Sequence, residues 1–336
     1  MAYEEELRIA VESVALACRL CRRVRSVHLA RDVIRKEDLS PVTVADFGSQ
    51  ALVGHCLQTA FPEDPLVAEE NSLLLREEWN AQVRRAVIDH VSHLQPGLGE
   101  QRILGSIDRG GAEGGSSGRF WTLDPIDGTK GFLRGDQYAV ALALLEEGRV
   151  VLGVLGCPNL SFHPQDAGTG IGTLFAAIRG RGTGMRDLET GKETSVRVSD
   201  LDDPSRALFC EPYESNHSSH GRSVEVMEVL GIRKPPVRMD GQGKYALVAR
   251  GEADLYMRLP TEQSYEEKIW DHAAGALIVE EAGGRATDLD NRPLDFRRGR
   301  TLAYNRGIIV SNGRIHERVL EAVERVLSRP ASVGSC

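Results

Sequence analysis

Apolar residues recur at helical spacing in the first third of the chain. Between residues 3 and 29 they fall on every third or fourth position, which predicts one long amphipathic helix. The same spacing predicts helices over 42–61, where Pro62 ends the pattern, and over 73–94. A stretch rich in Gly and Ser at 105–120 predicts a mobile surface loop, because such residues pack little core.

Short apolar runs predict strands through the middle of the chain. They lie at 65–68, 120–123, 138–145, 150–157, 172–178, 194–198 and 207–211. From about residue 220, predicted helices alternate with short strands. The helices lie at 221–230, 243–250, 271–282 and 314–327, and the strands at 254–258 and 307–311. We therefore expect an α+β protein with strands between helix layers, in two lobes spanning 1–160 and 161–330.

Composition and charge narrow the class of protein. The 336 residues are 41% hydrophobic and 27% charged, as in soluble globular proteins. A net charge of −8 argues against a general nucleic-acid or membrane binder, so an anionic substrate would need divalent cations or a local basic cluster. No apolar stretch approaches the ~20 residues of a membrane span. The acidic N-terminus is unlike a signal or transit peptide, so we expect a cytoplasmic protein. An organelle is the alternative if a transit segment has been removed.

The six cysteines do not resemble a disulfide framework in a chain of this length. Cys18 and Cys21 form a C-x-x-C pair inside the first predicted helix, and no second Cys or His pair lies nearby. We interpret them as helix residues, with a zinc or redox role as the alternative.

Acidic residues gather where predicted strands meet helices or turns. They are Asp46, Glu69, Glu70, Asp124, Asp127 and Asp271. Each has an ordinary structural explanation. Asp46 could lie on the exposed side of a first helical turn, the two glutamates could form a solvated strand end, and Asp271 could be a helix N-cap. Pro125 and Asp127-Gly128 are strong turn signals on their own.

These separate explanations leave the clustering itself unexplained. Carboxylates that converge without basic partners repel one another. Mg²⁺ removes that penalty, because it prefers carboxylate and carbonyl oxygens and keeps several waters. Two ions ~3.5–4 Å apart can hold both the attacking water and the leaving oxygen of a phosphoryl displacement. The pattern therefore favours a metal-dependent phosphatase.

Four other residues are candidates for the same site. Thr129 begins a predicted helix, where it could act as a cap or place its hydroxyl near the metals. Lys244 and Arg258 are either solvated charges or phosphate ligands. His217 lies in a polar loop without a metal-ligand pattern, which favours a loop or substrate role.

Four motifs resemble the lithium-sensitive, Mg²⁺-dependent phosphomonoesterase superfamily of inositol monophosphatases and fructose bisphosphatases. They are PVTVAD (41–46), VAEENS (67–72), WTLDPIDGTKGFLRG (121–135) and KIWDHAAGALIVEEAGG (268–284). GCPNL (156–160), HSSH (217–220) and YMRLP (256–260) are similar to its 3′(2′),5′-bisphosphate nucleotidase branch. The similarity covers about residues 5–325 and implies a layered αβαβα sandwich.

The resemblance assigns roles to individual residues. It implies that Glu69, Asp124, the Ile126 carbonyl, Asp127 and Asp271 bind two or three Mg²⁺ ions. Asp46 and Thr129 resemble the pair that activates the attacking water, and Glu70 supports the ligands from behind. His217, Lys244 and Arg258, together with Thr129 and Asp271, match positions that contact the substrate.

The activity implied is removal of the 3′-phosphate of adenosine 3′,5′-bisphosphate, with 3′-phosphoadenosine 5′-phosphosulfate as a second candidate substrate. An inositol polyphosphate 1-phosphatase and a catalytically weak nucleotide sensor are the alternatives. The expected partner is thus a small molecule, and a monomer is expected, with a dimer as the alternative. Two positions depart from the pattern: Ala68 replaces the usual Gly, and Gly241 replaces a serine that touches substrate in yeast-type enzymes.

Overall fold

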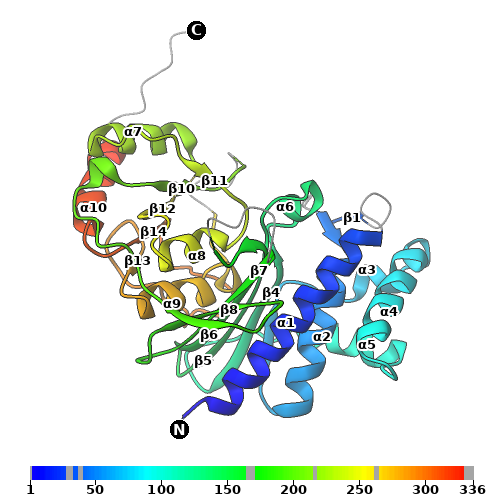
Figure 1. Ribbon diagram of the computed structural model, residues 1–336. Helices are drawn as coiled ribbons and strands as arrows, with labels where there is room; N and C mark the ends of the chain where they lie inside the picture. The colour runs from blue at the N-terminus through cyan, green and yellow to red at the C-terminus, as the bar shows by residue number, and fades with distance from the viewer. Residues whose placement is uncertain are drawn as a thin grey trace.

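The protein is a five-layered α+β sandwich in which helices and sheets alternate (Figure 1). The computed structural model describes residues 2–27, 33–36, 41–163, 171–214, 218–260 and 265–328. Its order of layers is helices, a seven-stranded sheet, helices, a five-stranded sheet and helices, which confirms the expected αβαβα arrangement.

The first layer consists of long helices packed on the larger sheet. α1 (Glu4–Val27) and α2 (Val44–Ala60) contact each other and the sheet, and α4 (Ala81–Leu94) and α5 (Glu100–Asp108) pack against α2. A small ribbon of β1 (Val33–Arg35) and β2 (Pro41–Thr43) leads into α2. Cys18 and Cys21 are buried in α1, in agreement with their interpretation as helix residues.

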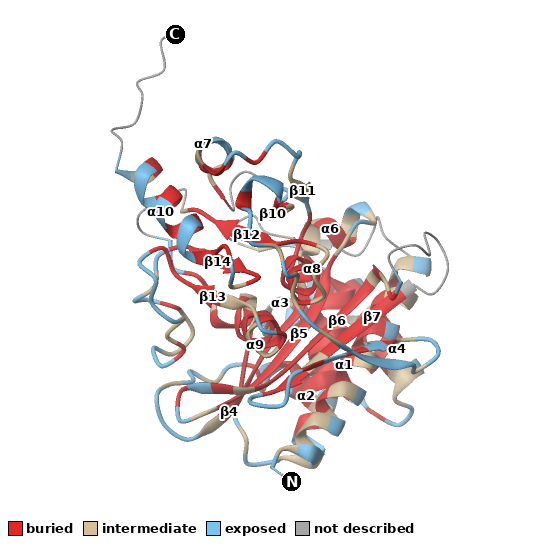
Figure 2. Cartoon of the chain, turned by 60° about the vertical axis from the view of Figure 1, so that its left-hand side comes forward, coloured by how far each residue is buried: buried red, intermediate tan, exposed pale blue. Residues whose placement is uncertain are grey.

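The larger sheet is almost entirely antiparallel and lies at the centre of the buried core (Figure 2). In spatial order, its strands are β3 (Leu66–Ala68), β4 (Arg119–Asp127), β5 (Ala139–Glu146), β6 (Arg149–Ser161), β7 (Ile171–Ile178), β8 (Thr183–Asp187) and β9 (Glu193–Val196). Only the pair β3–β4 is parallel in this sheet.

The smaller sheet is separated from the larger one by a layer of two buried helices, α8 (Gly243–Ala249) and α9 (Ala273–Glu281). Its order is β11 (Val237–Arg238), β10 (Phe209–Glu211), β12 (Leu255–Arg258), β14 (Ile308–Ser311) and β13 (Arg285–Thr287). α7 (His220–Leu230) and α10 (His316–Leu327) cover its outer face. Single turns complete the fold: α3 (Leu73–Arg76), η1 (Glu78–Asn80), α6 (Thr129–Arg134), η2 (Pro204–Arg206) and η3 (Ile269–Asp271).

Two expected helix boundaries were wrong. The helix expected over 73–94 is divided into α3, η1 and α4, because side-chain hydrogen bonds stabilise a corner between them. Asn80 Nδ2 donates to the Leu74 carbonyl at 2.8 Å, and Arg84 Nη1 donates to that of Leu75 at 3.0 Å. The expected loop at 105–120 begins later, since α5 continues to Asp108 and buries Ile107.

The expected lobe boundary at residue 160 falls inside the larger sheet, because β7, β8 and β9 extend that sheet beyond it. The chain passes from one sheet to the other between Val196 and Phe209. We therefore propose this connection as the boundary, and the division into two lobes stays a prediction. Among the described residues, the helices are all too short or too polar to cross a bilayer.

Candidate active site

The site begins where β3 ends beside its parallel neighbour β4. Ala68 at the end of β3 is in register with Leu123, so the next residue of each segment, Glu69 after β3 and Asp124 within β4, lies at the same edge of this pairing. Parallel strands present their carboxyl ends together, and this edge is the usual place for a functional site in such a sheet.

A bulge in β4 brings two aspartates to the same face of the sheet. Asp124 pairs with Ala141 of β5 and Asp127 with Ala139, so three steps along β4 match two along β5. In a regular strand, residues three apart point to opposite faces. The extra residue at Pro125-Ile126 restores the parity, and both carboxylates line one cavity. β4 therefore continues through Pro125 to Asp127, rather than ending at Leu123 as expected.

Gly128 turns the chain from β4 into α6. Its φ of +92° lies in the left-handed region, and a Cβ there would come within 2.9 Å of Asp240. Thr129 is consequently the first residue of α6 and not its cap, so its hydroxyl is free to point elsewhere.

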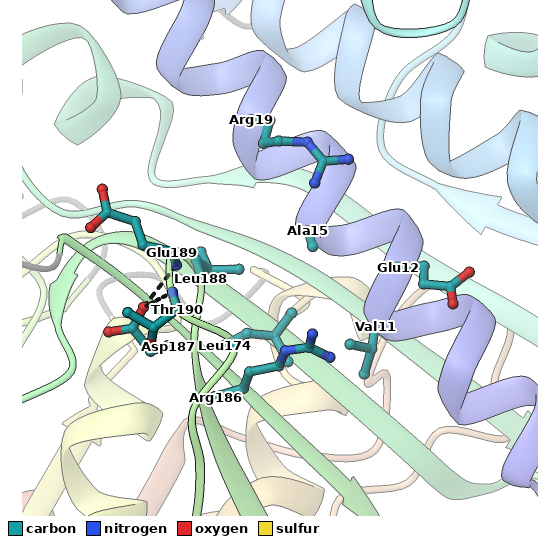
Figure 3. Close-up of a pocket in the computed structure, with 11 residues that line it drawn as sticks. Val11, Glu12, Ala15, Arg19, Leu174, Arg186, Asp187, Leu188, Glu189 and Thr190 are labelled. Carbon is teal, nitrogen blue, oxygen red and sulfur yellow. Dashed lines mark hydrogen bonds between the residues drawn. The ribbon is translucent and has the colours of Figure 1, made fainter.

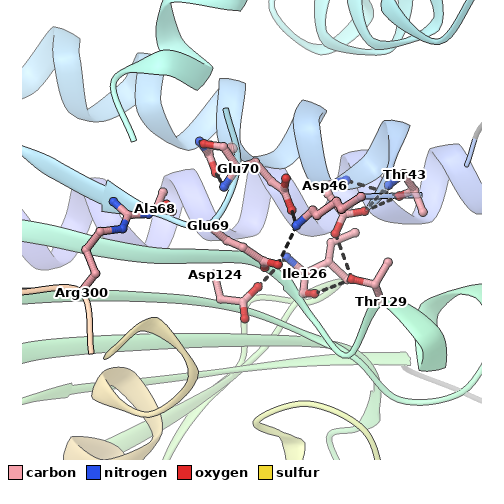
Figure 4. A network of polar contacts seen from close by, with 11 residues as sticks. Thr43, Asp46, Ala68, Glu69, Glu70, Asp124, Ile126, Thr129 and Arg300 are labelled. Carbon is pink, nitrogen blue, oxygen red and sulfur yellow. Dashed lines mark hydrogen bonds and ion pairs between the residues drawn. The ribbon is translucent and has the colours of Figure 1, made fainter. Parts of the chain in front are cut away.

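Thr129 and Asp46 are joined by a hydrogen bond (Figure 4). Thr129 Oγ1 donates to Asp46 Oδ1 at 3.1 Å and lies 3.2 Å from the Ile126 carbonyl oxygen. The other oxygen of Asp46 accepts from the backbone N–H of Thr43 at 2.8 Å, in a capping box that begins α2. Asp46 is buried rather than exposed on the helix surface, and burial raises its pKa to about 7 although the bonds from Thr43 oppose the shift.

Both glutamates form ion pairs with one lysine that was not among the predicted site residues. Lys36 Nζ lies 2.9 Å from Glu69 Oε1 and 2.5 Å from Glu70 Oε1. Glu70 is buried, whereas Glu69 is partly exposed and lines the cavity, so the pair is not a solvated strand end. Lys36 follows β1, where its position in the chain carries no pattern that points to the site.

Three of the predicted site residues, Lys244, Arg258 and Asp271, come from the part of the chain that forms the smaller sheet and the helices beside it. Asp271 ends η3 and also lines the cavity; His272 precedes α9, so Asp271 is not the N-cap of that helix as expected. Arg258 at the end of β12 forms an ion pair with Glu267, with Nε 2.9 Å from Oε1, and its Nη1 lies 3.9 Å from Asp271 Oδ2. Lys244 is buried and donates to the carbonyls of Met239 and Gly241, at 3.0 and 2.6 Å.

These groups surround a cavity of about 490 Å³. Its acidic lining residues are Glu69, Asp124, Asp127, Glu214, Asp240 and Asp271, and its basic ones are Lys36, Lys130, Lys244, Arg258 and Lys268. Thr129 and Ile126 also line it. The site therefore draws on both sheets, with its walls formed by β3, β4, β12 and the turns that follow them.

Ionisation is unfavourable for the carboxyl groups that line this cavity. Burial raises the pKa of Asp124 well above its usual range, and the neighbouring Glu69, Asp127 and Asp271 raise it further. Burial, followed by repulsion from Asp127, does the same to the pKa of Asp271. Burial also raises the pKa of Asp127, against the opposing effect of Lys244 and Arg258. Such a set of carboxylate oxygens, with the Ile126 carbonyl beside it, is the donor chemistry that suits Mg²⁺.

A second cavity, of about 320 Å³, lies between α1 and the β7–β8 region (Figure 3). It is lined by charged side chains of both signs and by the apolar residues Val11, Ala15, Leu174 and Leu188. Asp187, the buried acid there, already accepts the backbone N–H groups of Glu189 and Thr190. This cavity therefore lacks the converging carboxylates of the first.

The structure brings most of the predicted site residues to one cavity, with Glu70 directly behind it. Asp46 is buried behind Thr129, to which it is hydrogen-bonded, and is not itself a lining residue. His217 lies outside the described residues. The Gly at 241 also has a structural reason: its φ is +65°, and a Cβ there would overlap the Asp127 carbonyl oxygen. Lys36, Glu267 and Tyr265 were not among the predicted site residues. Tyr265 Oη accepts a hydrogen bond from Arg258 Nη2 at 3.3 Å, and Glu267 forms an ion pair with the same guanidinium.

Comparison with known proteins agrees with the motifs. The model of the inositol monophosphatase family matches residues 3–328. The chain is 44% identical to a 3′(2′),5′-bisphosphate nucleotidase of Emericella nidulans, over 97% of this chain and 99% of that protein. It is 46% identical to 3′(2′),5′-bisphosphate nucleotidase 1 of Arabidopsis thaliana, over 96% of each. An inositol monophosphatase from Thermotoga maritima has the same fold, with a TM-score of 0.65 at 23% identity, over 96% of this chain and 98% of that one.

Proposed function

The chain belongs to the inositol monophosphatase family, and on that premise we propose that it hydrolyses the 3′-phosphate of adenosine 3′,5′-bisphosphate to AMP and inorganic phosphate. The substrate rests on the near full-length identity to nucleotidases. The chemistry rests on one observation above all: the Asp46–Thr129 hydrogen bond lies beside the converging carboxylates of Asp124, Asp127 and Asp271.

The family is generally Mg²⁺-dependent, and the residues of this cavity fit that ion. Glu69, Asp124, Asp127, Asp271 and the Ile126 carbonyl are the proposed ligands for two or three ions, and Glu70 supports Glu69 through their shared partner Lys36. Bound Mg²⁺ would neutralise the phosphoryl oxygens and lower the pKa of the attacking water. Family membership also implies inhibition by Li⁺.

Asp46 and Thr129 handle the proton of the attacking water. Because Thr129 donates its hydroxyl hydrogen to Asp46, its oxygen can accept a hydrogen bond from a water in the cavity. As the water oxygen bonds to phosphorus, its proton passes to Thr129 while the Thr129 proton passes to Asp46. A carboxylate with a pKa of about 7 is well matched to this role near neutral pH. The P–O3′ bond breaks on the opposite side, and the ribose oxygen takes a proton from a water near Asp271.

The cations of the second lobe bind the substrate. Arg258 is held at the cavity wall by Glu267, so one edge of its guanidinium can face a phosphate or its neighbours. Lys244 reaches the same cavity from α8, and burial lowers its pKa against the opposing effect of Asp127 and Asp240. Thr129, Asp271 and His217 are the remaining proposed substrate contacts. The substrate class also includes 3′-phosphoadenosine 5′-phosphosulfate as a candidate.

The enzyme acts on small phosphate esters, and we propose that it works as a cytoplasmic monomer without nucleic-acid or membrane partners. Sedimentation of the purified protein measures the oligomeric state directly. A dimer at micromolar concentration would contradict the monomer.

A substrate panel tests the function. With Mg²⁺, phosphate release is compared from adenosine 3′,5′-bisphosphate, inositol 1-phosphate, inositol 1,4-bisphosphate and fructose 1,6-bisphosphate. The nucleotide is expected to have the highest kcat/KM. A tenfold preference for an inositol phosphate would overturn the assignment, and nucleotide binding without turnover would indicate a sensor.

A variant of the cavity tests the metal chemistry. Asp127→Asn removes one buried carboxylate at constant shape, and we expect it to abolish turnover while the fold is retained. Asp89→Asn is the matched control, because Asp89 is exposed on α4, outside the cavity lining. Turnover like wild type in Asp127→Asn would contradict the proposed ligands.

A further inference from the structure

A network of mostly buried polar side chains lies behind Arg258 and Asp271, which line the cavity. Tyr245 Oη lies 2.7 Å from His272 Nδ1, and His272 Nε2 lies 3.2 Å from Glu267 Oε2. The other carboxylate oxygen of Glu267 lies 2.9 Å from Arg258 Nε. Arg258 Nη1 then lies 3.9 Å from Asp271 Oδ2. Four of these residues, Tyr245, His272, Glu267 and Arg258, are less than a tenth exposed.

Three of these residues have the spacing of a metal site. Ligand atoms of Glu267, Asp271 and His272 lie within 4.8 Å of one another. However, both ring nitrogens of His272 and both oxygens of Glu267 have protein partners at 2.7–3.2 Å. Burial also lowers the pKa of His272, so the imidazole is neutral and bonded on both sides. We conclude that Glu267 and His272 form a protein network, and that Asp271 alone of the three faces the cavity.

Arg258 lies between two acids, Glu267 and Asp271, at different distances from each. Its short contact is with Glu267, at 2.9 Å, and its contact with Asp271 is a full ångström longer. A bidentate arginine–carboxylate pair has N···O distances near 2.7–2.9 Å. If Arg258 closed on Asp271 in that way, it would occupy the oxygens that the proposed function assigns to a divalent cation.

We propose that Glu267 is a positioning residue that holds Arg258 away from Asp271 and so keeps the Asp271 carboxylate available for a divalent cation. The ion pair places Nε 2.9 Å from Glu267 Oε1, Nη2 donates to Tyr265 Oη at 3.3 Å, and Arg258 lines the cavity. The second oxygen of Glu267 contacts His272, which in turn contacts Tyr245, so these two residues extend the buried network behind the ion pair. This inference rests on the proposed function, because it takes Asp271 to be a metal ligand.

The test measures binding of Mn²⁺ to the full chain by the loss of the free-ion EPR signal, which requires no turnover. Glu267→Gln keeps the size of the side chain but removes its charge, so Arg258 is drawn to Asp271. We expect Mn²⁺ affinity to fall about tenfold, in the range found for groups that support metal ligands. Glu267→Asp retains the charge and should restore the affinity to within threefold of wild type.

A double-mutant cycle separates this role from direct ligation. In an Arg258→Met background there is no guanidinium to close on Asp271, so adding Glu267→Gln should change Mn²⁺ affinity by less than twofold. The double variant also removes both buried charges together, which keeps the comparison available if Glu267→Gln alone does not fold. An equal loss in both backgrounds would mean that Glu267 binds the ion itself and would overturn the proposal, as would unchanged affinity in Glu267→Gln.

Tyr245→Phe provides the matched structural control. It removes the hydroxyl that anchors His272 but leaves the Glu267–Arg258 pair in place, so it should lower the melting temperature with Mn²⁺ affinity within twofold of wild type. A tenfold loss in this variant would show that any disturbance of the network weakens metal binding, and would overturn the specific role of Glu267. Hydrolysis of adenosine 3′,5′-bisphosphate by the wild-type chain is assayed separately, so failure of the function and failure of this inference are distinguishable.

Discussion

Replacing Asp46 with asparagine should make the metal-free protein more stable at alkaline pH and inactive at every pH. Asp46 is 1% exposed, and its pKa rises from 3.8 to about 7 in the folded protein. Because each pKa unit is equivalent to about 1.36 kcal/mol, ionised Asp46 costs the folded state about 4 kcal/mol at pH 8. An asparagine avoids this cost and fits the same contacts. Its oxygen can accept from the Thr43 N–H, and its amide can donate to Thr129, which then donates to the Ile126 carbonyl 3.2 Å away.

The sign of the pH dependence follows from the direction of the shift. A carboxyl whose pKa is higher in the folded state favours folding below its unfolded pKa, and that contribution is lost as the pH rises through the folded value. Wild-type stability from Asp46 therefore declines between about pH 4 and pH 7, whereas the amide of Asp46→Asn does not titrate. Exchanging a charge-assisted bond from Thr43 for a neutral one costs ~1 kcal/mol, so we expect a net gain of about 3 kcal/mol at pH 8.

Urea unfolding in EDTA at pH 5 and pH 8 measures this difference. The free energy of unfolding of Asp46→Asn should exceed that of wild type clearly at pH 8 and much less at pH 5. Asp89→Asn, on the exposed face of α4, should show no such divergence. If the advantage of Asp46→Asn were the same at both pH values, the assignment of a raised pKa to Asp46 would be refuted. Activity should be lost because an asparagine cannot take the proton of Thr129.

Three further predictions concern the same cavity. Burial and mutual repulsion raise the pKa values of Asp124 and Asp271, so the metal-free protein should melt at a lower temperature at pH 8 than at pH 6. Mg²⁺ should raise the melting temperature more at pH 8 than at pH 6, and an equal rise at both pH values would contradict this prediction. Gly241→Ala should lower the free energy of unfolding, measured by chemical denaturation, by at least ~1 kcal/mol, because the φ of +65° and the nearby Asp127 carbonyl leave no room for a Cβ. The control Gly105→Ala, at a position with open space, should leave the free energy of unfolding unchanged or raise it. Arg300 donates to the Ala68 carbonyl just before Glu69 (Figure 4) and to the carbonyl of Ala112. Arg300→Met should therefore raise about tenfold the Mg²⁺ concentration that gives half-maximal kcat, and an unchanged concentration would refute this prediction.

The fold could be predicted to the level of its layers, because helical and strand spacing were strong in most elements. Two elements were predicted wrongly, each for a physical reason of its own. Pro125 was expected to end a strand, but a bulge accommodates a residue without an N–H, so β4 continues to Asp127. The corner between α3 and α4 depends on side-chain bonds from Asn80 and Arg84 to distant carbonyls, which spacing does not encode.

Some residues of the candidate site could be predicted from the sequence, and others could not. Residues that lie in short motifs, such as Asp124, Asp127 and Thr129, could be predicted because the motif carries both ligand chemistry and turn chemistry. Lys36 and Glu267 could not, because each acts on residues that the fold brings close. Lys36 contacts Glu69 and Glu70, 33 and 34 positions away, and Glu267, before η3, contacts Arg258 at the end of β12.

The bulge in β4 has a consequence for how this segment can change over evolutionary time. Between Asp124 and Asp127, the two residues Pro125 and Ile126 of β4 oppose the single residue Val140 of β5. Deleting one residue there would produce a more regular ladder and a perfectly acceptable strand, yet it would turn Asp127 to the opposite side of the sheet. The segment can thus accept changes in residue type more readily than a change in length. Insertions and deletions, which surface loops absorb freely, are expected to be selected against at this point for the sake of the chemistry and not of the fold.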